Sequence, residues 1–571
     1  MPSRINNLVS PIITFLFLWT IYLTTLAPTI SPDDAGELIT ASYTLGISHP
    51  PGYSFYALFT SCWLNLPLGS IALRANLGSL GCICLAMLVV FFLLRCCLLN
   101  GSLSIIGALT AGVLPTTWRQ AALSEVYALH LLFSLLTLYF ILRPASKSKA
   151  YQTSMVWGFS LLAHYQNLFL FPFVVFRLWR LRQRGLTLLL VLGITSLSLL
   201  YFPLRATTWP NLNWGVPTNV NRLMNHLSRA QYQEINQGHS LLASLTQWGY
   251  FVKLQARELP PILLILPVIG LAYLARRARG QMALLVALYL AYFLLSSHFL
   301  NYANFTRASY LGPKFLLLNS TILVILLTSG LAQINQLLPL KKLLAIGLCL
   351  PLFLLLSNKS QSDFSSYFTV SDYTSNLQAQ LPQNSRLFLN EDFEIFPLTF
   401  TSLVEGKRPD LAIFDFNSEP FESIFENLDP LKIYNISYDY SKINRGLHRK
   451  EPLYLAYNPP NIRIKLYPLG YFYSAGQPLP HRLDTIPFRY KPQYADYANR
   501  YLAARFYLAQ SLRTALSSPQ QSARDLQTSS ELSYDQSTLK RQLAKAYQNL
   551  GQNQKAQAEF SQALRLEKQG L

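Results

Sequence analysis

The sequence predicts a polytopic α-helical membrane protein with a C-terminal water-soluble region. The chain of 571 residues is 51% hydrophobic and only 13% charged, whereas about 25% of the residues of a soluble domain are charged. Its acidic residues are also unevenly spread. Only six of the 27 Asp and Glu residues lie within residues 1–356. The chain therefore consists of a membrane part followed by a soluble tail.

A membrane-spanning helix needs about 20 apolar residues. Apolar runs predict eleven spans, near residues 9–27, 72–94, 102–118, 124–142, 153–164, 167–179, 186–204, 259–276, 281–299, 312–333 and 341–356. The first run lacks a small-residue cleavage site before Pro28, so we interpret it as a retained anchor. Two short segments that turn around His164 are preferred to one helix, because both flanking basic clusters then face the cytoplasm.

Basic residues occur in short clusters between the apolar runs, and no Asp or Glu shares those loops. Such clusters are typical of cytoplasmic loops, so the net charge of +20 indicates topology and not nucleic-acid binding. With a cytoplasmic N terminus, the loops 28–71 and 204–258 and the tail are expected outside the cytoplasm. The six cysteines lie in or beside apolar segments and form no disulfide framework or zinc-binding pattern.

The tail is expected to form two soluble domains that follow the membrane domain of residues 1–356. Helical and strand-like patterns alternate within residues 357–490, which predicts an extracytoplasmic α/β domain. Within residues 491–571, Ala and Leu recur at helical spacing. The stretch "LAKAYQNLGQNQKAQAEFSQALRLE" matches one tetratricopeptide-type helix pair. Because one pair cannot bury its own apolar face, helices at 494–516 and 520–528 are expected to pack against it.

Asp33, Asp34, Glu37 and His49 gather in the stretch "PTISPDDAGELITASYTLGISHPPGY", just after the first span. Carboxylates at a membrane are costly and usually functional. The "SPDD" sequence is typical of a helix start, and residues 34 and 37 then share one helix face. Helix capping accounts well for Asp33 and less well for Glu37. A base that takes a proton from an attacking hydroxyl is the alternative role.

This stretch, with the following "SFYALF", resembles the first outer loop of a GT-C glycosyltransferase family of protein O-mannosyltransferases. That family was long catalogued as a domain of unknown function. The further blocks that carry the resemblance are "LPTTWRQAALSEVYALH" (114–130), "GFSLLAHYQN" (158–167), "YFPLRATTWPNLNWGVPTNVNRLMNHLSRAQY" (201–232) and "LNEDFEIFPLTFTSLVEGKRPDLAIFD" (389–415). The resemblance implies transfer of a sugar, mannose or another hexose, from a polyprenyl-phosphate lipid to a Ser or Thr hydroxyl of an exported protein.

The resemblance also implies catalytic roles for the acidic cluster. Asp34 is expected to be the general base, with Glu37 as a companion that orients the acceptor or the sugar. The family usually has an aromatic residue and a single Asp where this chain has two aspartates. Alignment through the pattern "D-x-G-E" favours Asp34, and Asp33 stays an alternative.

A phosphate leaving group needs little protonation, so cations that bind it are the second requirement. Arg119 and Arg205 are expected to bind the donor phosphate, because both lie at the outer ends of predicted spans and have forked donors. His49 is a third candidate. Membrane anchoring is an equally good interpretation for each arginine. A structural role with a hydrogen-bonded side chain is an equally good interpretation for His49. No cofactor and no divalent metal are expected.

Four further residues are candidates for binding the sugar or the acceptor. Asn213 and Trp214 lie in "NLNWG", where an aromatic face suits a pyranose ring, although a tryptophan at the membrane interface is the plainer interpretation. Glu125 and His164 lie at expected outer helix ends. For Glu125, capping a helix or pairing with Arg119 is the plainer role. For His164, a structural hydrogen bond is the plainer role.

Three rival interpretations stay open at this point. The acceptor of the same reaction could be a lipid or a glycan instead of a protein. A polytopic transporter is disfavoured because internal repeats and polar residues at mid-membrane are not seen. A membrane-tethered scaffold does not explain the acidic cluster. The expected location is a membrane, with a bacterial plasma membrane favoured over the endoplasmic reticulum.

Overall fold

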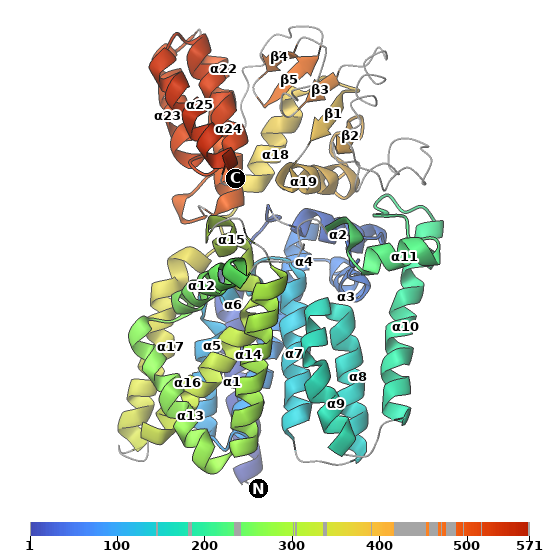
Figure 1. Ribbon diagram of the computed structural model, residues 1–571, viewed down its shortest axis with the longest axis vertical. Helices are drawn as coiled ribbons and strands as arrows, with labels where there is room; N and C mark the ends of the chain where they lie inside the picture. Colours follow the sequence, from blue (N-terminus) through green and yellow to red (C-terminus); the bar gives the residue numbers. More distant parts are fainter. Residues whose placement is uncertain are drawn as a thin grey trace. The chain divides into compact units, whose positions relative to one another are not determined.

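The structure is a computed structural model (Figure 1). It describes the chain except for residues 1, 33, 144–146, 181–184, 233–240, 301, 303–304, 335–339, 390, 416–452, 456–465, 470, 476–486, 495, 516 and 569–571. Asp33 therefore lies outside the described residues. The chain forms two compact units. Residues 1–28, 50–204 and 223–366 form the membrane unit, and residues 29–49, 205–222 and 367–571 form the loop–tail unit. The three-domain division of the chain stays a prediction.

The membrane unit is a bundle of helices, in keeping with the polytopic helical fold that the sequence predicts. Its long helices are α1 (Pro2–Thr24), α4 (Ile71–Cys96), α7 (Val126–Leu142), α8 (Lys147–Ala163), α10 (Gly185–Thr207), α12 (Leu241–Glu258), α13 (Ile265–Arg277), α14 (Arg279–Phe299), α16 (Leu317–Ile334) and α17 (Leu340–Ser362). Its shorter helices are α3 (Ser54–Leu64), α5 (Gly101–Gly112), α6 (Pro115–Ala122), α9 (Phe171–Arg180) and α15 (Phe305–Phe315), with a 3₁₀ turn at Tyr165–Leu170. α10 ends in the loop–tail unit, and α11 (Val220–Leu227) crosses the boundary between the units.

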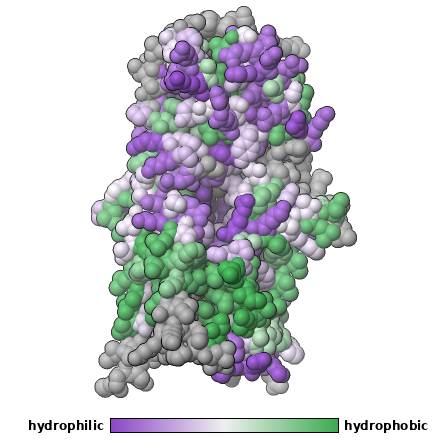
Figure 2. All heavy atoms as spheres, turned by 90° about the vertical axis from the view of Figure 1, so that its left-hand side faces the viewer, coloured by the Kyte–Doolittle hydropathy of each residue, from purple (hydrophilic) through white to green (hydrophobic). Residues whose placement is uncertain are grey.

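By length and composition, four described helices can cross a membrane: α4, α10, α14 and α16. Two helix pairs also qualify but are sharply bent, namely α6 with α7 (119°) and α12 with α13 (104°). In the view of Figure 2, hydrophobic residues gather over the lower part of the surface, where they suit contact with lipid. Eleven crossings stay a prediction.

One local expectation for the membrane unit was wrong. The segment 102–118 was expected to be one span, but α5 ends at Gly112 and α6 begins at Pro115. Proline lacks the N–H that would continue the first helix, and it suits the start of the second. The expected outer loop of residues 204–258 contains the 18-residue helix α12, and its side of the membrane stays a prediction.

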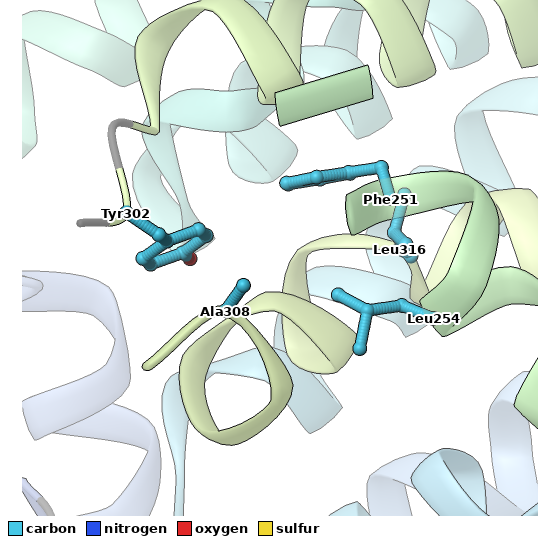
Figure 3. Packing of buried hydrophobic residues seen from close by; sticks show 5 residues of the cluster. All are labelled: Phe251, Leu254, Tyr302, Ala308 and Leu316. Atoms are coloured by element: carbon cyan, nitrogen blue, oxygen red, sulfur yellow. The ribbon is translucent and has the colours of Figure 1, made fainter. Parts of the chain in front are cut away.

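A cluster of buried apolar residues fixes α12 against α15 (Figure 3). It comprises Phe251 and Leu254 of α12, Ala308 of α15, and the adjoining Tyr302 and Leu316. The rings of Phe251 and Tyr302 stack with their centroids 6.3 Å apart. This packing determines where α15 places its own polar side chains.

The loop–tail unit contains α2 (Ala35–Thr44) and a five-stranded sheet of order β2-β1-β3-β5-β4. The strands are β1 (Arg386–Leu389), β2 (Ala412–Asp415), β3 (Leu453–Leu455), β4 (Leu466–Leu469) and β5 (Phe472–Ala475). β1 pairs in parallel with β2 and β3, whereas β5 pairs antiparallel with β3 and β4. With α18 (Thr369–Gln380) and α19 (Asp392–Leu403), these strands confirm the α/β pattern expected from the alternating sequence.

The C-terminal part of this unit forms two helical hairpins. They are α22 (Tyr497–Thr514) with α23 (Pro519–Leu532), and α24 (Ser537–Asn549) with α25 (Asn553–Lys568). Gly551, with φ +71°, makes the turn of the second hairpin. The expected helix pair is therefore present at its predicted place. Its assignment as a tetratricopeptide unit stays a prediction.

We predict that Gly270→Ala destabilises the membrane unit. A methyl group on Gly270 of α13 would lie 1.8 Å from the carbonyl oxygen of Leu326 in α16, and forcing the helices apart should cost about 1–3 kcal/mol. Thermal unfolding in detergent should show a lower midpoint. Gly249→Ala in α12 is the control, because no atom lies within 4 Å of that added methyl group. Equal midpoints for the two variants would contradict this account of the packing.

Candidate active site

The acidic helix α2 begins at the pair of carboxylates that the sequence singles out. Asp34 is its N-cap residue, and Glu37 lies in its first turn. Within the described part of the chain, the Asp34 side chain forms no capping hydrogen bond, and the residue is partly exposed. Glu37 is fully buried, with 0% exposure. The two carboxylates therefore have different environments although they are only one helical turn apart.

Glu37 is held by both polar groups of His49. The backbone N–H of His49 donates to Oε1 of Glu37 at 2.5 Å, and its Nδ1 lies 2.6 Å from Oε2. A buried carboxylate must be paired in this way to offset the loss of its hydration. These contacts give His49 a role in holding the acidic helix, and its predicted contact with a donor phosphate stays a prediction.

The chain between α2 and His49 is also attached to a segment that is distant in sequence. Ile47 forms a parallel β-bridge with Asn213, in which the Ile47 N–H donates to the Leu212 carbonyl at 2.8 Å. A methyl group on Gly46 would lie 2.4 Å from that same carbonyl oxygen. The Asn213 side chain donates to the carbonyl of Ala206 at 3.1 Å. These contacts give Leu212 and Asn213 of the "NLNWG" sequence a structural role that requires no bound sugar.

Arg205 binds the C-terminal end of the acidic helix. Its Nε donates to the Leu45 carbonyl at 2.6 Å, and its Nη2 donates to the Thr44 carbonyl at 3.0 Å. The last carbonyls of a helix have no partner within the helix, and a cation near them is stabilising. Arg205 thus caps α2 through its forked donors. Its binding to phosphate stays a prediction.

Trp214 is packed inside the loop–tail unit with 3% exposure. Its ring centroid lies 6.0 Å from that of His49 and 6.3 Å from that of Phe396 in α19. Gly36 approaches the same helix closely, since a methyl group there would lie 2.5 Å from the Phe396 carbonyl oxygen. These contacts indicate a packing role for Trp214 beside the carboxylates. Stacking on a sugar stays a prediction.

In the membrane unit, Glu125 lies next to a cation that the sequence did not single out. Glu125 is the N-cap residue of α7, and its Oε1 lies 3.8 Å from Nζ of Lys314 in α15. The Lys314 ammonium lies 5.0 Å from the ring centroid of Tyr127. Both charged residues are more than 90% buried. A buried lysine in a membrane protein is a candidate binding residue for an anion.

His164 connects this pair to a second cation through aromatic rings. Its ring centroid lies 5.1 Å from that of Tyr127, 4.5 Å from that of Tyr165 and 5.7 Å from that of Tyr53. The guanidinium of Arg229 lies 5.1 Å from the ring centroid of Tyr165. We call Tyr53, Glu125, Tyr127, His164, Tyr165, Arg229 and Lys314 the cation–tyrosine cluster. It combines two cations and one carboxylate with the rings of one histidine and three tyrosines.

The predicted site residues are therefore distributed over both units. Asp34, Glu37, His49, Arg205, Asn213 and Trp214 belong to the loop–tail unit. Arg119, Glu125 and His164 belong to the membrane unit, where the Arg119 guanidinium lies 5.5 Å from the ring centroid of Phe364. Sequence reasoning missed Lys314, Arg229 and Phe396. Lys314 lies within the expected span 312–333 and Arg229 within the quoted block 201–232, and these positions were the available signals for the two cations.

The chain is similar to known proteins both in sequence and in fold. A family model described as "Protein O-mannosyl-transferase TMEM260 N-terminal domain" matches residues 34–187. "Protein O-mannosyl-transferase TMEM260" of Mus musculus is 27% identical over 467 residues, which cover 74% of this chain. The chain spans 64% of the length of that relative.

The chain is thus similar in sequence to a protein O-mannosyltransferase. The resemblance predicted from sequence is thus confirmed. ArnT from Cupriavidus metallidurans has a similar fold, with TM-scores of 0.50 for its complex with undecaprenyl phosphate and 0.51 for its apo state. Each alignment is 13% identical and covers 83% of this chain and 98% of ArnT. This likeness shows that the chain shares the fold of ArnT.

We predict that Arg205→Lys loosens the C-terminal end of α2. Lysine lacks the fork that reaches two carbonyls at once, and losing one charged hydrogen bond costs about 1.5 kcal/mol. Hydrogen exchange of amides within residues 41–49 should accelerate by about tenfold. Arg222→Lys is the control, because the hydrogen bond of Arg222 to Asn219 involves its backbone nitrogen. Unchanged exchange in Arg205→Lys would refute the capping role.

Proposed function

We propose that this protein is a glycosyltransferase that transfers a sugar from a polyprenyl-phosphate lipid to a Ser or Thr hydroxyl of an exported protein. Three observations support the proposal: the family match, the fold shared with ArnT, and the pair of carboxylates on α2. The ArnT structure contains undecaprenyl phosphate, which is a polyprenyl phosphate. Mannose is the sugar that the name of the mouse relative suggests.

The observation that carries the catalytic assignment is the contrast between the two carboxylates. Both oxygens of Glu37 are bonded to His49, and the residue is fully buried. Asp34 is partly exposed at the helix N terminus, where it can meet a substrate hydroxyl. Asp34 is therefore the general base, and Glu37 holds the loop that presents it.

In the proposed reaction, the acceptor hydroxyl oxygen attacks the anomeric carbon of the sugar. A bond forms between that oxygen and the anomeric carbon, and the bond from the anomeric carbon to the phosphate oxygen breaks. The polyprenyl phosphate leaves with the electron pair of the broken bond. Asp34 takes the proton of the acceptor hydroxyl, and general-base assistance of this kind contributes about 10²–10⁴-fold to a rate.

We assign binding of the donor phosphate to the cation–tyrosine cluster. Lys314 and Arg229 supply positive charge, and the surrounding tyrosines supply hydroxyl donors. Arg205 already donates two hydrogen bonds to carbonyls of the acidic helix, which favours Lys314 and Arg229 for the phosphate. Arg119 is kept as a third cation of the membrane unit. Cations of this kind stabilise the charge that develops on the leaving phosphate.

The loop that carries Asp34 and the tail are proposed to lie outside the cytoplasm. Basic residues lie at the ends of several membrane-unit helices, as Arg95 does in α4, Arg180 in α9 and Arg277 in α13. These ends suit the cytoplasmic side. α7 also ends directly before Arg143 and begins after Glu125, which supports an outer position for the start of α7.

Asp34→Asn should abolish most of the sugar transfer, because an amide cannot accept the proton. We expect kcat to fall by about 10²–10⁴-fold with the folded protein retained. The assay uses purified protein, a polyprenyl-phosphate mannose and an unstructured Ser/Thr-rich peptide. Glu405→Gln is the matched control, because Glu405 is an exposed residue outside α2 that pairs with Lys407. Wild-type rates in Asp34→Asn would overturn the assignment of the base.

Lys314→Gln and Arg229→Gln should each weaken donor binding, because each removes a positive charge from the phosphate site. We expect the KM for the lipid donor to rise about tenfold, as for loss of one charge-assisted hydrogen bond. The KM for the peptide should change little. Lys253→Gln is the control, since Lys253 lies on the exposed face of α12 over Phe305. An unchanged KM for the donor in both variants would exclude this phosphate site.

We propose that the reaction needs no divalent metal, because arginine and lysine side chains supply the positive charge that the leaving phosphate requires. In the part of the chain that the structure describes, no group of three His, Cys, Asp or Glu side chains is arranged to hold a metal ion. Full activity is therefore expected in EDTA. Restoration of a lost activity by manganese after chelation would contradict this prediction.

The same assay with lipid or glycan acceptors tests the rival acceptor class.

A further inference from the structure

Helix α19 of the α/β region contacts the acidic helix directly. The backbones of the two helices touch at Gly36, whose added methyl group would lie 2.5 Å from the Phe396 carbonyl oxygen. Side chains pack tightly in such a contact, and interhelical approach at glycine leaves little room for movement. α19 therefore restricts where α2 can lie within the loop–tail unit.

A continuous series of contacts runs from α19 to the buried carboxylate. The ring of Phe396 contacts the ring of Trp214, with centroids 6.3 Å apart. The rings of Trp214 and His49 meet edge to face, with their centroids 6.0 Å apart. His49 then binds Glu37 through Nδ1 at 2.6 Å. Each of these four residues is buried, so none of the side chains can turn without displacing its neighbour.

The same helix is fixed to the C-terminal helices by a buried ion pair. Glu394 of α19 lies 3.2 Å from Nη2 of Arg505 in α22, and both side chains are nearly inaccessible. The Tyr373 hydroxyl donates to Glu394. Burial and the neighbouring Glu394 carboxylate raise the pKa of Tyr373 well above its usual value, so its phenol keeps the donated proton. Arg505 also donates to the Tyr471 carbonyl at 2.7 Å.

We infer that α19 is a positioning element for the catalytic loop. Phe396 sets the orientation of Glu37 through Trp214 and His49, and the Glu394–Arg505 pair holds α19 in place. The tail thus contributes to catalysis through residues that touch no substrate. This inference rests on the proposed function and deepens it, because it makes the α/β region and the C-terminal helices part of the same catalytic unit.

The kinetic test compares Phe396→Leu with Leu398→Ala. Leu398 is as deeply buried as Phe396 but lies two residues farther along the helix, on the opposite face. We expect kcat to fall at least tenfold in Phe396→Leu with the donor KM within twofold of wild type. Phe396→Met should restore part of the rate, because its sulfur can contact the Trp214 ring. Equal loss of kcat in Leu398→Ala would overturn the inference.

An exchange measurement tests the positioning role without any turnover. The His49 amide donates to Oε1 of Glu37, so its hydrogen exchange reports the pair directly. We expect exchange within residues 37–49 to accelerate at least fivefold in Phe396→Leu and in Glu394→Gln, and to stay unchanged in Leu398→Ala. Wild-type exchange in both test variants would overturn the inference. Accelerated exchange together with a wild-type protein that transfers no sugar would support positioning and reject the proposed function.

Discussion

The pairing of Glu37 with His49 is the constraint on which the candidate site depends. Burying a carboxylate with 0% exposure is costly unless its oxygens are bonded. Both are bonded to one residue, through its backbone N–H and its ring nitrogen. The pair therefore closes the chain between positions 37 and 49 into a fixed loop. Asp34, one turn before Glu37, is left at the partly exposed end of that loop.

This loop is fixed from several sides by segments that are far away in the sequence. Arg205 holds the end of α2, the backbone of Asn213 pairs with Ile47, and α19 packs against Gly36. Because these attachments come from residues 205–214 and from α19, the first loop and the tail fold as one compact unit. A loop held in this way can present a base in a fixed geometry, which is what catalysis by a positioned group requires.

Elements with a strong local pattern were predicted well from the sequence. Strands β1 and β2 and helices α18 and α19 alternate within residues 357–490, as the sequence pattern predicts. Local breaks were predicted less well, because a single proline at residue 115 divides an apolar run that is long enough for one span. Helix α12 was missed because its apolar residues face a partner, as Phe251 faces Tyr302, and its polar residues made the segment resemble a loop.

The sequence by itself determined the class of the protein, its apolar helices and the presence of an acidic cluster beside the first span. Composition and periodicity are local properties, and they suffice for these conclusions. Only the tertiary structure decided that Glu37 is the buried carboxylate and that the Arg205 guanidinium is bonded to carbonyls. It also brought Lys314 beside Glu125, 189 positions earlier in the chain. The environment of a side chain depends on which distant segments pack around it, and no local pattern records that packing.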